Sequence, residues 1–114
     1  MTAGYIDIFL DQGTTCVYTL SLYDDKTNSL INIAGYQFFS SIRLSHYSQN
    51  ATANFTCTIS DASNGKIDIS IDAGTTANIN PGRYVFDIIS INTEQEKQKF
   101  IEGIIHVSPT VTKF

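Results

Sequence analysis

Residues 64–87, NGKIDISIDAGTTANINPGRYVFD, decide the fold. After an Asn-Gly turn, isoleucine alternates with polar residues from Lys66 to Asp72. Alternation with a period of two and one apolar face is typical of a half-buried antiparallel strand. The polar link from Ala73 to Asn80 has room for one helical turn, and an Asn-Pro-Gly turn then precedes a strand that begins at Arg83. Two strands joined in this way predict the middle of a β-sandwich.

Other stretches of the chain alternate in the same way. The strand that begins at Arg83 extends to about Asn92, and its broken pattern at Ile88-Ile89 predicts a bulge. Gly103 falls inside the last strand, where a glycine gives room for a close neighbour. The remaining predicted strands are Tyr5 to Leu10, Thr15 to Asp24, Tyr36 to Ser45, Ala53 to Ser60 and Gln98 to Ser108.

Short strands at roughly ten-residue spacing, separated by turn residues, are typical of an immunoglobulin-like sandwich. We therefore predict an all-β fold, a single Ig-like antiparallel β-sandwich of about seven strands over residues 1–108, with a short C-terminal tail over 109–114. The likeness is one of architecture only, because the chain has no Trp for the Cys-Trp-Cys framework of true immunoglobulin domains.

Length and charge exclude several classes of protein. A chain of 114 residues predicts one domain. The net charge is −4 and the seven Lys and Arg residues are scattered, which argues against a nucleic-acid surface. No apolar stretch approaches the ~20 residues that span a membrane, and the first ten residues lack the basic start of a signal peptide. We expect a protein kept in the cytoplasm, or delivered outside as part of a larger particle.

The sequence has two cysteines, Cys16 and Cys57, both at predicted inward positions. They could form a disulfide bond or remain as reduced core thiols. Without a signal peptide the reduced form is expected, since disulfides belong to oxidising compartments and free cysteine is commonly buried.

Residues that carry enzyme chemistry are not grouped in this sequence. His46 and His106 lack neighbouring His, Cys or carboxylate residues at metal-ligand spacing. No Gly-x-Ser-x-Gly elbow and no glycine-rich phosphate loop is present. The sequence thus predicts no catalytic residue, no metal site and no cofactor, and we expect a protein that is not an enzyme.

The predicted solvent sides of several strands carry large apolar residues: Phe9, Val17, Tyr23, Phe39, Phe100 and Ile104. Two explanations fit. The residues form a patch at an interface, or the register of one or two strands is off by one residue, which would turn the side chains inward. The tail Thr110 to Phe114 is a second candidate contact, either donated to a neighbour's sheet edge with Phe114 as an anchor or frayed.

Four stretches together resemble a known family. Leu30 to Ser45 (LINIAGYQFFSSIRLS), Gly65 to Asp72, Pro81 to Ile88 (PGRYVFDI) and Ile101 to Thr112 (IEGIIHVSPTVT) are similar, in order and spacing, to small β-sandwich structural proteins of bacteriophages and prophages. These share their layout with the sandwich domain that opens some phage baseplate proteins. The recurrent positions of the family have structural roles and carry no catalysis; here they are Gly35, Gly82, Arg83, Tyr84, Gly103 and Pro109.

The resemblance implies a non-enzymatic virion protein on the capsid, neck, tail or baseplate, present in the host cytoplasm during assembly. Its partners would be other virion proteins or further copies of itself, without nucleic acid or membrane. The alternative function is a recognition module whose loops, His46 to Thr52 and Asp24 to Asn28, bind a carbohydrate or receptor of the host surface.

Overall fold

The computed structural model describes residues 4–23 and 29–112, in which the alternating segments form seven strands and the link from Ala73 forms a single helical turn. The predicted all-β class is confirmed, and each predicted strand is present with small shifts at its ends. The predicted turn at Asp24 to Asn28 lies outside the described residues. The elements are β1 (Gly4–Asp11), β2 (Cys16–Ser21), β3 (Gln37–Arg43), β4 (Ala53–Asp61), β5 (Lys66–Ile71), α1 (Ala73–Thr76), β6 (Gly82–Ile91) and β7 (Lys97–Ser108).

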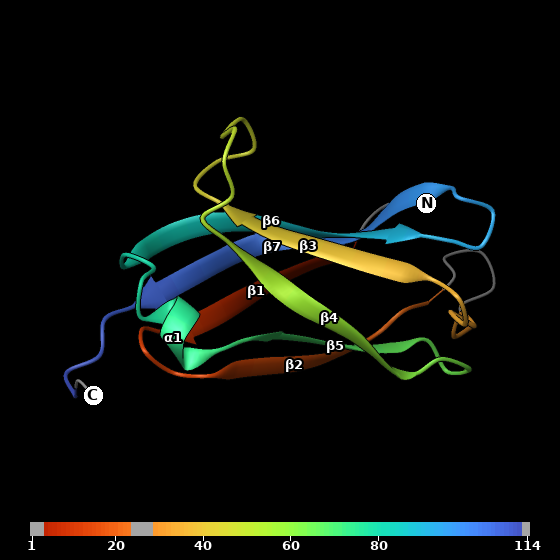
Figure 1. Cartoon of the computed structure of the whole chain (residues 1–114), viewed down its shortest axis with the longest axis horizontal. Coiled ribbons are helices and arrows are strands. Elements are labelled where there is room, and N and C mark those ends of the chain that lie inside the picture. Colours follow the sequence, from red (N-terminus) through yellow and green to blue (C-terminus); the bar gives the residue numbers. More distant parts are fainter. Residues whose placement is uncertain (1–3, 24–28, 113–114) are drawn as a thin grey trace.

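All seven strands belong to one sheet with the order β1-β7-β6-β3-β4-β5-β2. The sheet folds over at β4, whose first residues pair with β3 while the residues from Thr56 onward pair with β5. β4 therefore crosses diagonally from the layer of β1, β7, β6 and β3 to the layer of β5 and β2 (Figure 1). The result is a flattened, nearly closed barrel, and it does not separate into the two sheets of the predicted sandwich.

One pair of strands corrects the antiparallel prediction. β1 lies parallel to β7, with Gly4 beside Ile101 and Asp11 beside Ser108. The two strands come from opposite ends of the described chain. No hairpin turn joins them, so the local sequence does not indicate whether they pair parallel or antiparallel. The remaining pairs in the sheet are antiparallel.

The core fills the space between the two layers and consists largely of isoleucine. Its most buried members come from the inward positions of the strands, from the segment before β3 and from the segment after α1: Ile8, Leu10, Ile33, Ile42, Ile67, Ile69, Ile79, Ile88 and Ile105. The Thr76 hydroxyl of α1 is buried and donates to the Thr14 oxygen at 2.7 Å, which fixes the helix to the β1–β2 turn. The Tyr84 hydroxyl donates to the Asn80 oxygen at 2.8 Å, as in the tyrosine corner of immunoglobulin-type folds.

The irregularity predicted near Ile88-Ile89 is present, but the extra residue belongs to β7. Ile88 pairs with Ile101 and Ile89 pairs with Lys99, which leaves Phe100 without an opposite residue. Both Phe100 and Ile101 therefore point into the core, where they are 6% and 8% exposed. The prediction that Phe100 faces solvent is wrong, because a bulge in β7 reverses the side-chain alternation at this residue.

Two other predicted positions have different outcomes. The predicted strand from Tyr36 to Ser45 included Leu44, but β3 ends at Arg43 and Leu44 is 67% exposed in the loop that follows. Gly103 gives room to a close neighbour as predicted, since a Cβ atom at this position would collide with the backbone oxygen of Ile6 in β1. The glycine therefore sets how closely β1 approaches β7.

Asp61 and Asp72 stabilise turns through their charged forms. Hydrogen bonds from Asn64 to Asp61 and from Thr75 to Asp72 hold the pKa of each carboxyl below its ordinary value. In the unfolded chain the pKa of an aspartate carboxyl is about 3.9. The two carboxyls therefore contribute stability above that pH, and the contribution is lost as the pH falls through their lower pKa values in the folded chain. The Asp61→Asn, Asp72→Asn double variant is therefore expected to lose less stability than the parent between about pH 5 and pH 2. Urea midpoints measured across this range test the prediction, and parallel curves for the two proteins would contradict it.

Candidate interface

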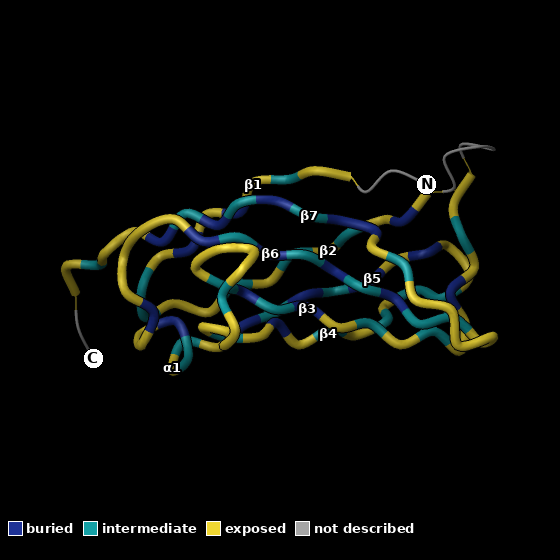
Figure 2. Tube along the Cα trace, turned by 90° about the horizontal axis from the view of Figure 1, so that it is seen from above, coloured by how far each residue is buried: buried dark blue, intermediate teal, exposed yellow. Residues whose placement is uncertain are grey.

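Along β1, β7, β6 and β3, exposed and half-buried residues alternate with buried ones (Figure 2). The solvent-facing side of these strands, called the outer face here, carries most of the exposed aromatic residues of the strands. The strand register assigns its residues to rows that run across the four strands. Its apolar and aromatic members are Tyr5, Phe9, Phe39, Val85, Ile89, Ile91, Ile104 and His106.

One end of the outer face is an aromatic patch. Phe9 lies beside His106, and their rings stack at 4.9 Å between centroids with 14° between planes. In the next row Ile104 pairs with Val85, so the stack continues into an aliphatic surface. Phe9 itself is 66% exposed, so this patch leaves a large apolar side chain in contact with solvent.

The other end of the outer face is a second apolar patch. Phe39 of β3 is 55% exposed and lies beside Ile89, and the adjoining row contains the half-buried Ile91. Charged residues separate the two patches, with Lys99 and Glu102 forming an exposed ion pair at 3.2 Å. An exposed pair of this kind contributes little stability. The charged residues therefore chiefly divide the outer face into two apolar patches.

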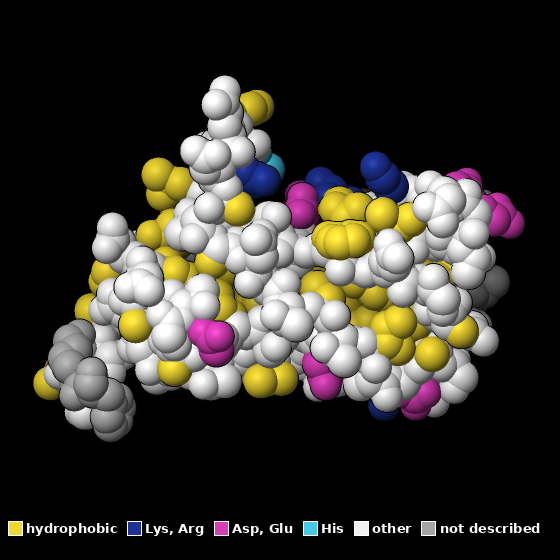
Figure 3. Space-filling view, viewed as in Figure 1, with side chains coloured by type: hydrophobic (Ala, Val, Ile, Leu, Met, Phe, Trp, Pro, Cys, Tyr) yellow, Lys and Arg dark blue, Asp and Glu magenta, His cyan; other side chains and the backbone are white. Residues whose placement is uncertain are grey.

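A loop over residues 44–52 projects from the sheet at the aromatic end (Figure 1). Arg43 fixes its base, because one guanidinium nitrogen donates to the Ser48 oxygen at 3.0 Å and to the Gln49 oxygen at 2.9 Å. Basic side chains and a histidine gather where the loop leaves the sheet (Figure 3). Between the loop and the strands lies a groove of about 390 Å³ lined by Tyr5, Leu44, His46, Arg83, Val85 and Ile104, among others.

The structure divides the predicted interface residues among several places. Phe9 and Phe39 are exposed on the outer face, and Ile104 is half-buried there. Val17 and Tyr23 are 59% and 52% exposed, but they lie on or just after β2, in the other layer. Phe100 is in the core, and Phe114 lies outside the described residues. The register explanation therefore holds for Phe100, whereas Phe9, Val17, Tyr23 and Phe39 are exposed as predicted.

Sequence reasoning missed several apolar residues that are exposed or half-buried at the surface. Ile89 and Ile91 reach the outer face because β6 keeps its regular alternation, which the misplaced bulge concealed. Tyr5 is 59% exposed at the start of β1, and Tyr47 is 94% exposed in the projecting loop. For Ile89 and Ile91, the sequence did contain a signal. The adjacent apolar residues Phe100 and Ile101 interrupt the alternation of β7 and so mark it, rather than β6, as the irregular strand.

The path of β4 limits its pairing with β3 to a few residues. Phe38 of β3 and Cys57 of β4 are half-buried and pack against the core. Hydrophobic surface is visible between these strands (Figure 3). Both cysteines are free, and they are half-buried rather than fully inside the core as predicted.

The Cys57 thiol is expected to react slowly in the folded protein. Burial raises its pKa to about 11 from an ordinary 9.0. Because the thiolate is the reactive form, alkylation by iodoacetamide at pH 8 is expected to be about 100-fold slower than in the urea-unfolded chain. A Cys16→Ser background isolates the reaction of Cys57. Equal rates in the folded and unfolded protein would contradict the burial described here.

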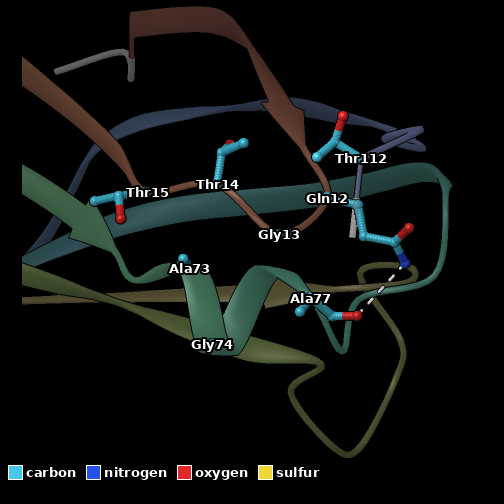
Figure 4. A pocket seen from close by; sticks show the side chains of 8 residues that line it. All are labelled: Gln12, Gly13, Thr14, Thr15, Ala73, Gly74, Ala77 and Thr112. Atoms are coloured by element: carbon cyan, nitrogen blue, oxygen red, sulfur yellow. Dashed lines mark hydrogen bonds between the residues drawn. The ribbon is translucent and has the colours of Figure 1, made fainter. Parts of the chain in front are cut away.

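A larger cavity of about 770 Å³ lies at one end of the barrel, between the β1–β2 turn, α1 and Thr112 (Figure 4). The Gln12 amide nitrogen donates to the oxygens of Ala77 and Ile79 at 3.5 and 3.1 Å, so it ties the turn to the segment after α1. The lining is made of threonines, glycines, alanines and this glutamine. It offers no titratable side chain for acid–base work.

The described residues bring no three His, Cys, Asp or Glu side chains together in a way that could hold a metal ion. Within residues 4–23 and 29–112, no helix is long and apolar enough to cross a membrane. The chemistry that the described surface does offer is apolar contact, with hydrogen-bonding groups at strand edges.

No protein-family model matches the chain, and no curated protein matches it in sequence. Among solved structures the chain is similar to the N-terminal domain of phage TP901-1 ORF48, with 14% identity, a TM-score of 0.55, and coverage of 96% of this chain and 98% of that one. CopC from Methylosinus trichosporium OB3b has 9% identity and a TM-score of 0.50 over 100% of this chain and 91% of that one.

A third structure, the Listeria monocytogenes internalin-like protein lmo2027, has 14% identity and a TM-score of 0.48, with 93% of this chain matching 28% of that one. The TM-score of this match is too low to support an argument. At such identities, the similarity to the other two structures shows a shared fold and nothing about activity.

Proposed function

We propose that this chain is a non-enzymatic structural protein of a bacteriophage virion, attached at repeated sites on the particle through its outer face. The observation that carries the proposal is the exposure of Phe9 and Phe39 on one face of the sheet. The phage assignment is supported by the sequence resemblance and by the fold shared, over nearly the full length of both chains, with a domain of a phage protein. Capsid, neck, tail and baseplate are all compatible sites.

The energetics favour a partner on this face. Solvated faces of antiparallel sheets usually carry polar residues, whereas this face exposes two phenylalanine rings by more than half. Burying two such rings would stabilise a complex by about 2–4 kcal/mol. That gain at many equivalent sites suits a protein that reinforces or extends a particle.

Quantitative mass spectrometry of gradient-purified particles tests this proposal. We expect the chain to be present at a fixed copy number relative to the other virion proteins, and to remain after repeated washing. Its absence from purified particles, with abundant chain left in the lysate, would overturn the proposal.

A second function, recognition of a host-surface carbohydrate or receptor, is favoured by one observation. Tyr47, in the projecting loop, is 94% exposed, and an accessible aromatic ring is a common contact for such ligands. We expect a Tyr47→Ala variant to retain particle attachment if the chain is structural. Binding of a multimeric form of the chain to host glycans, lost in Tyr47→Ala, would instead support recognition.

A further inference from the structure

β1 ends the sheet and leaves one side of its backbone open. It pairs only with β7. The Ile6 oxygen points toward β7, where it lies against Gly103, whereas the Phe9 amide points the other way, to the Tyr18 hydroxyl. Since successive residues of a strand direct their backbone groups to opposite sides, Tyr5, Asp7, Phe9 and Asp11 present theirs to the open side.

The open groups have few hydrogen-bond partners within the described chain. In the described part of the chain, no hydrogen bond engages the amides of Tyr5 and Asp7 or the carbonyl oxygens of Tyr5, Asp7 and Phe9. The Phe9 amide reaches the Tyr18 hydroxyl at 3.5 Å, which is beyond the usual range for an N–H donor. A strand placed here would replace one weak contact with a regular ladder.

This edge also lacks the usual protection against pairing. Edge strands are commonly blocked by Lys, by Pro, by bulges or by shortness. β1 has eight residues, GYIDIFLD, without Lys, Arg or Pro, and its register with β7 is regular from Gly4 to Asp11. β2, at the other end of the sheet, is also free of Lys, Arg and Pro. β1 is therefore open to an eighth strand.

The side chains beside this edge define the chemistry of the incoming strand. On the outer side the exposed carboxylates are Asp7 and Asp11, and neither β1 nor β2 carries a cation. On the inner side lie the half-buried Ile6 and, next to the Phe9 amide, Tyr18, and both pack against the core. Opposite charges on neighbouring strands attract and like charges repel, so the edge favours a strand with Lys or Arg on one side and apolar residues on the other.

We propose that the open edge of β1 accepts an extended basic segment of another virion protein as an eighth strand of the sheet. This inference rests on the proposed function and adds the class of partner and its mode of binding. A second copy of this chain fits less well, because pairing β1 with another β1 would bring four carboxylates together without a cation. β1 lies at one margin of the sheet (Figure 2).

Two synthetic peptides test the edge without any particle: Thr-Val-Lys-Val-Lys-Val-Lys-Thr and its counterpart with Glu in place of Lys. Amide hydrogen exchange of the full chain is followed by NMR with each peptide. We expect the Lys peptide to slow exchange at Tyr5, Asp7 and Phe9 at least tenfold and to bind at least tenfold more tightly than the Glu peptide. Absence of protection at these amides with either peptide at millimolar concentration overturns the proposal.

Matched variants separate charge from backbone. The Asp7→Lys, Asp11→Lys variant is expected to reverse the preference between the peptides, and the near-isosteric Asp7→Asn, Asp11→Asn variant to remove it. Melting temperatures confirm that each variant is folded. If the Asn variant still prefers the Lys peptide to the Glu peptide, charge recognition is contradicted. If the β1 amides are already protected from exchange in the chain alone, and the chain has the mass of a dimer, the edge is assigned to a second copy.

The same variants distinguish this inference from the proposed function. If the Asp7→Lys, Asp11→Lys variant enters particles as well as the parent does, the edge is not the contact, and the structural role stands. If the parent itself is absent from particles, the structural role fails, whereas the peptide measurements still decide whether β1 takes a basic strand.

Discussion

Replacing Gly103 by alanine is expected to lower the melting temperature by about 10–20 °C, the equivalent of roughly 3 kcal/mol in a domain of this size. The new Cβ atom would collide with the Ile6 oxygen and approach a ring carbon of Phe86 at 3.1 Å. Backbone on one side and a buried ring on the other leave little room for relaxation. β1 would have to move away from β7 and give up its ladder. Thermal unfolding followed by circular dichroism measures the effect.

Gly4→Ala is the matched control for this experiment. It lies on the same pair of strands, where a Cβ atom would meet the nearest atom, the Phe100 oxygen, at an ordinary 3.7 Å. We expect its melting temperature to stay within about 3 °C of the parent, as for a substitution without a clash. Equal effects of the two substitutions would contradict the close approach of β1 to β7.

Replacing Phe39 by aspartate is expected to weaken attachment to the particle at least about 100-fold, or roughly 3 kcal/mol. The ring is 55% exposed in the second apolar patch, and the proposed function requires the parent to bury it on attachment. Aspartate removes that apolar contact and places a charge that would lose its water in the complex. The chain itself should remain folded, because Phe39 faces solvent in the unbound protein.

Thr56→Asp controls for the added charge, since Thr56 is an exposed strand residue of β4 opposite Ser70, on the other layer. We expect this variant to attach as the parent does. Sedimentation of each variant with particles lacking the chain measures attachment. If a folded Phe39→Asp variant attaches normally, the outer face is not the attachment surface. If the variant fails to fold, Phe39 instead stabilises the isolated chain.

Much of this fold can be predicted from the sequence because its information is local. Alternation sets the strands, as in Lys66 to Asp72, and the short link after Asp72 forms the predicted helical turn. Gly103 was predicted to allow a close neighbour because a glycine inside an apolar strand needs a reason. These features depend on residues near each other in the chain.

The rest depends on pairings between distant residues. Alternation cannot show that β1 runs parallel to β7, nor that β4 leaves β3 at Thr56 to join β5. The bulge is visible in the sequence as a broken pattern, but the strand that carries the extra residue is set by the register of β6 with β7. Phe100 was misplaced for this reason, whereas Phe9 and Phe39, in regular strands, were placed correctly on the solvent side.

The most direct test of the structural role is the mass of particles that lack the chain, measured by sedimentation or light scattering as purified chain is added. The proposed function predicts a saturable increase that corresponds to a fixed number of copies per particle, reached by the parent and not by Phe39→Asp. No increase at any concentration, with binding to host cells instead, would contradict the structural role and support the recognition module.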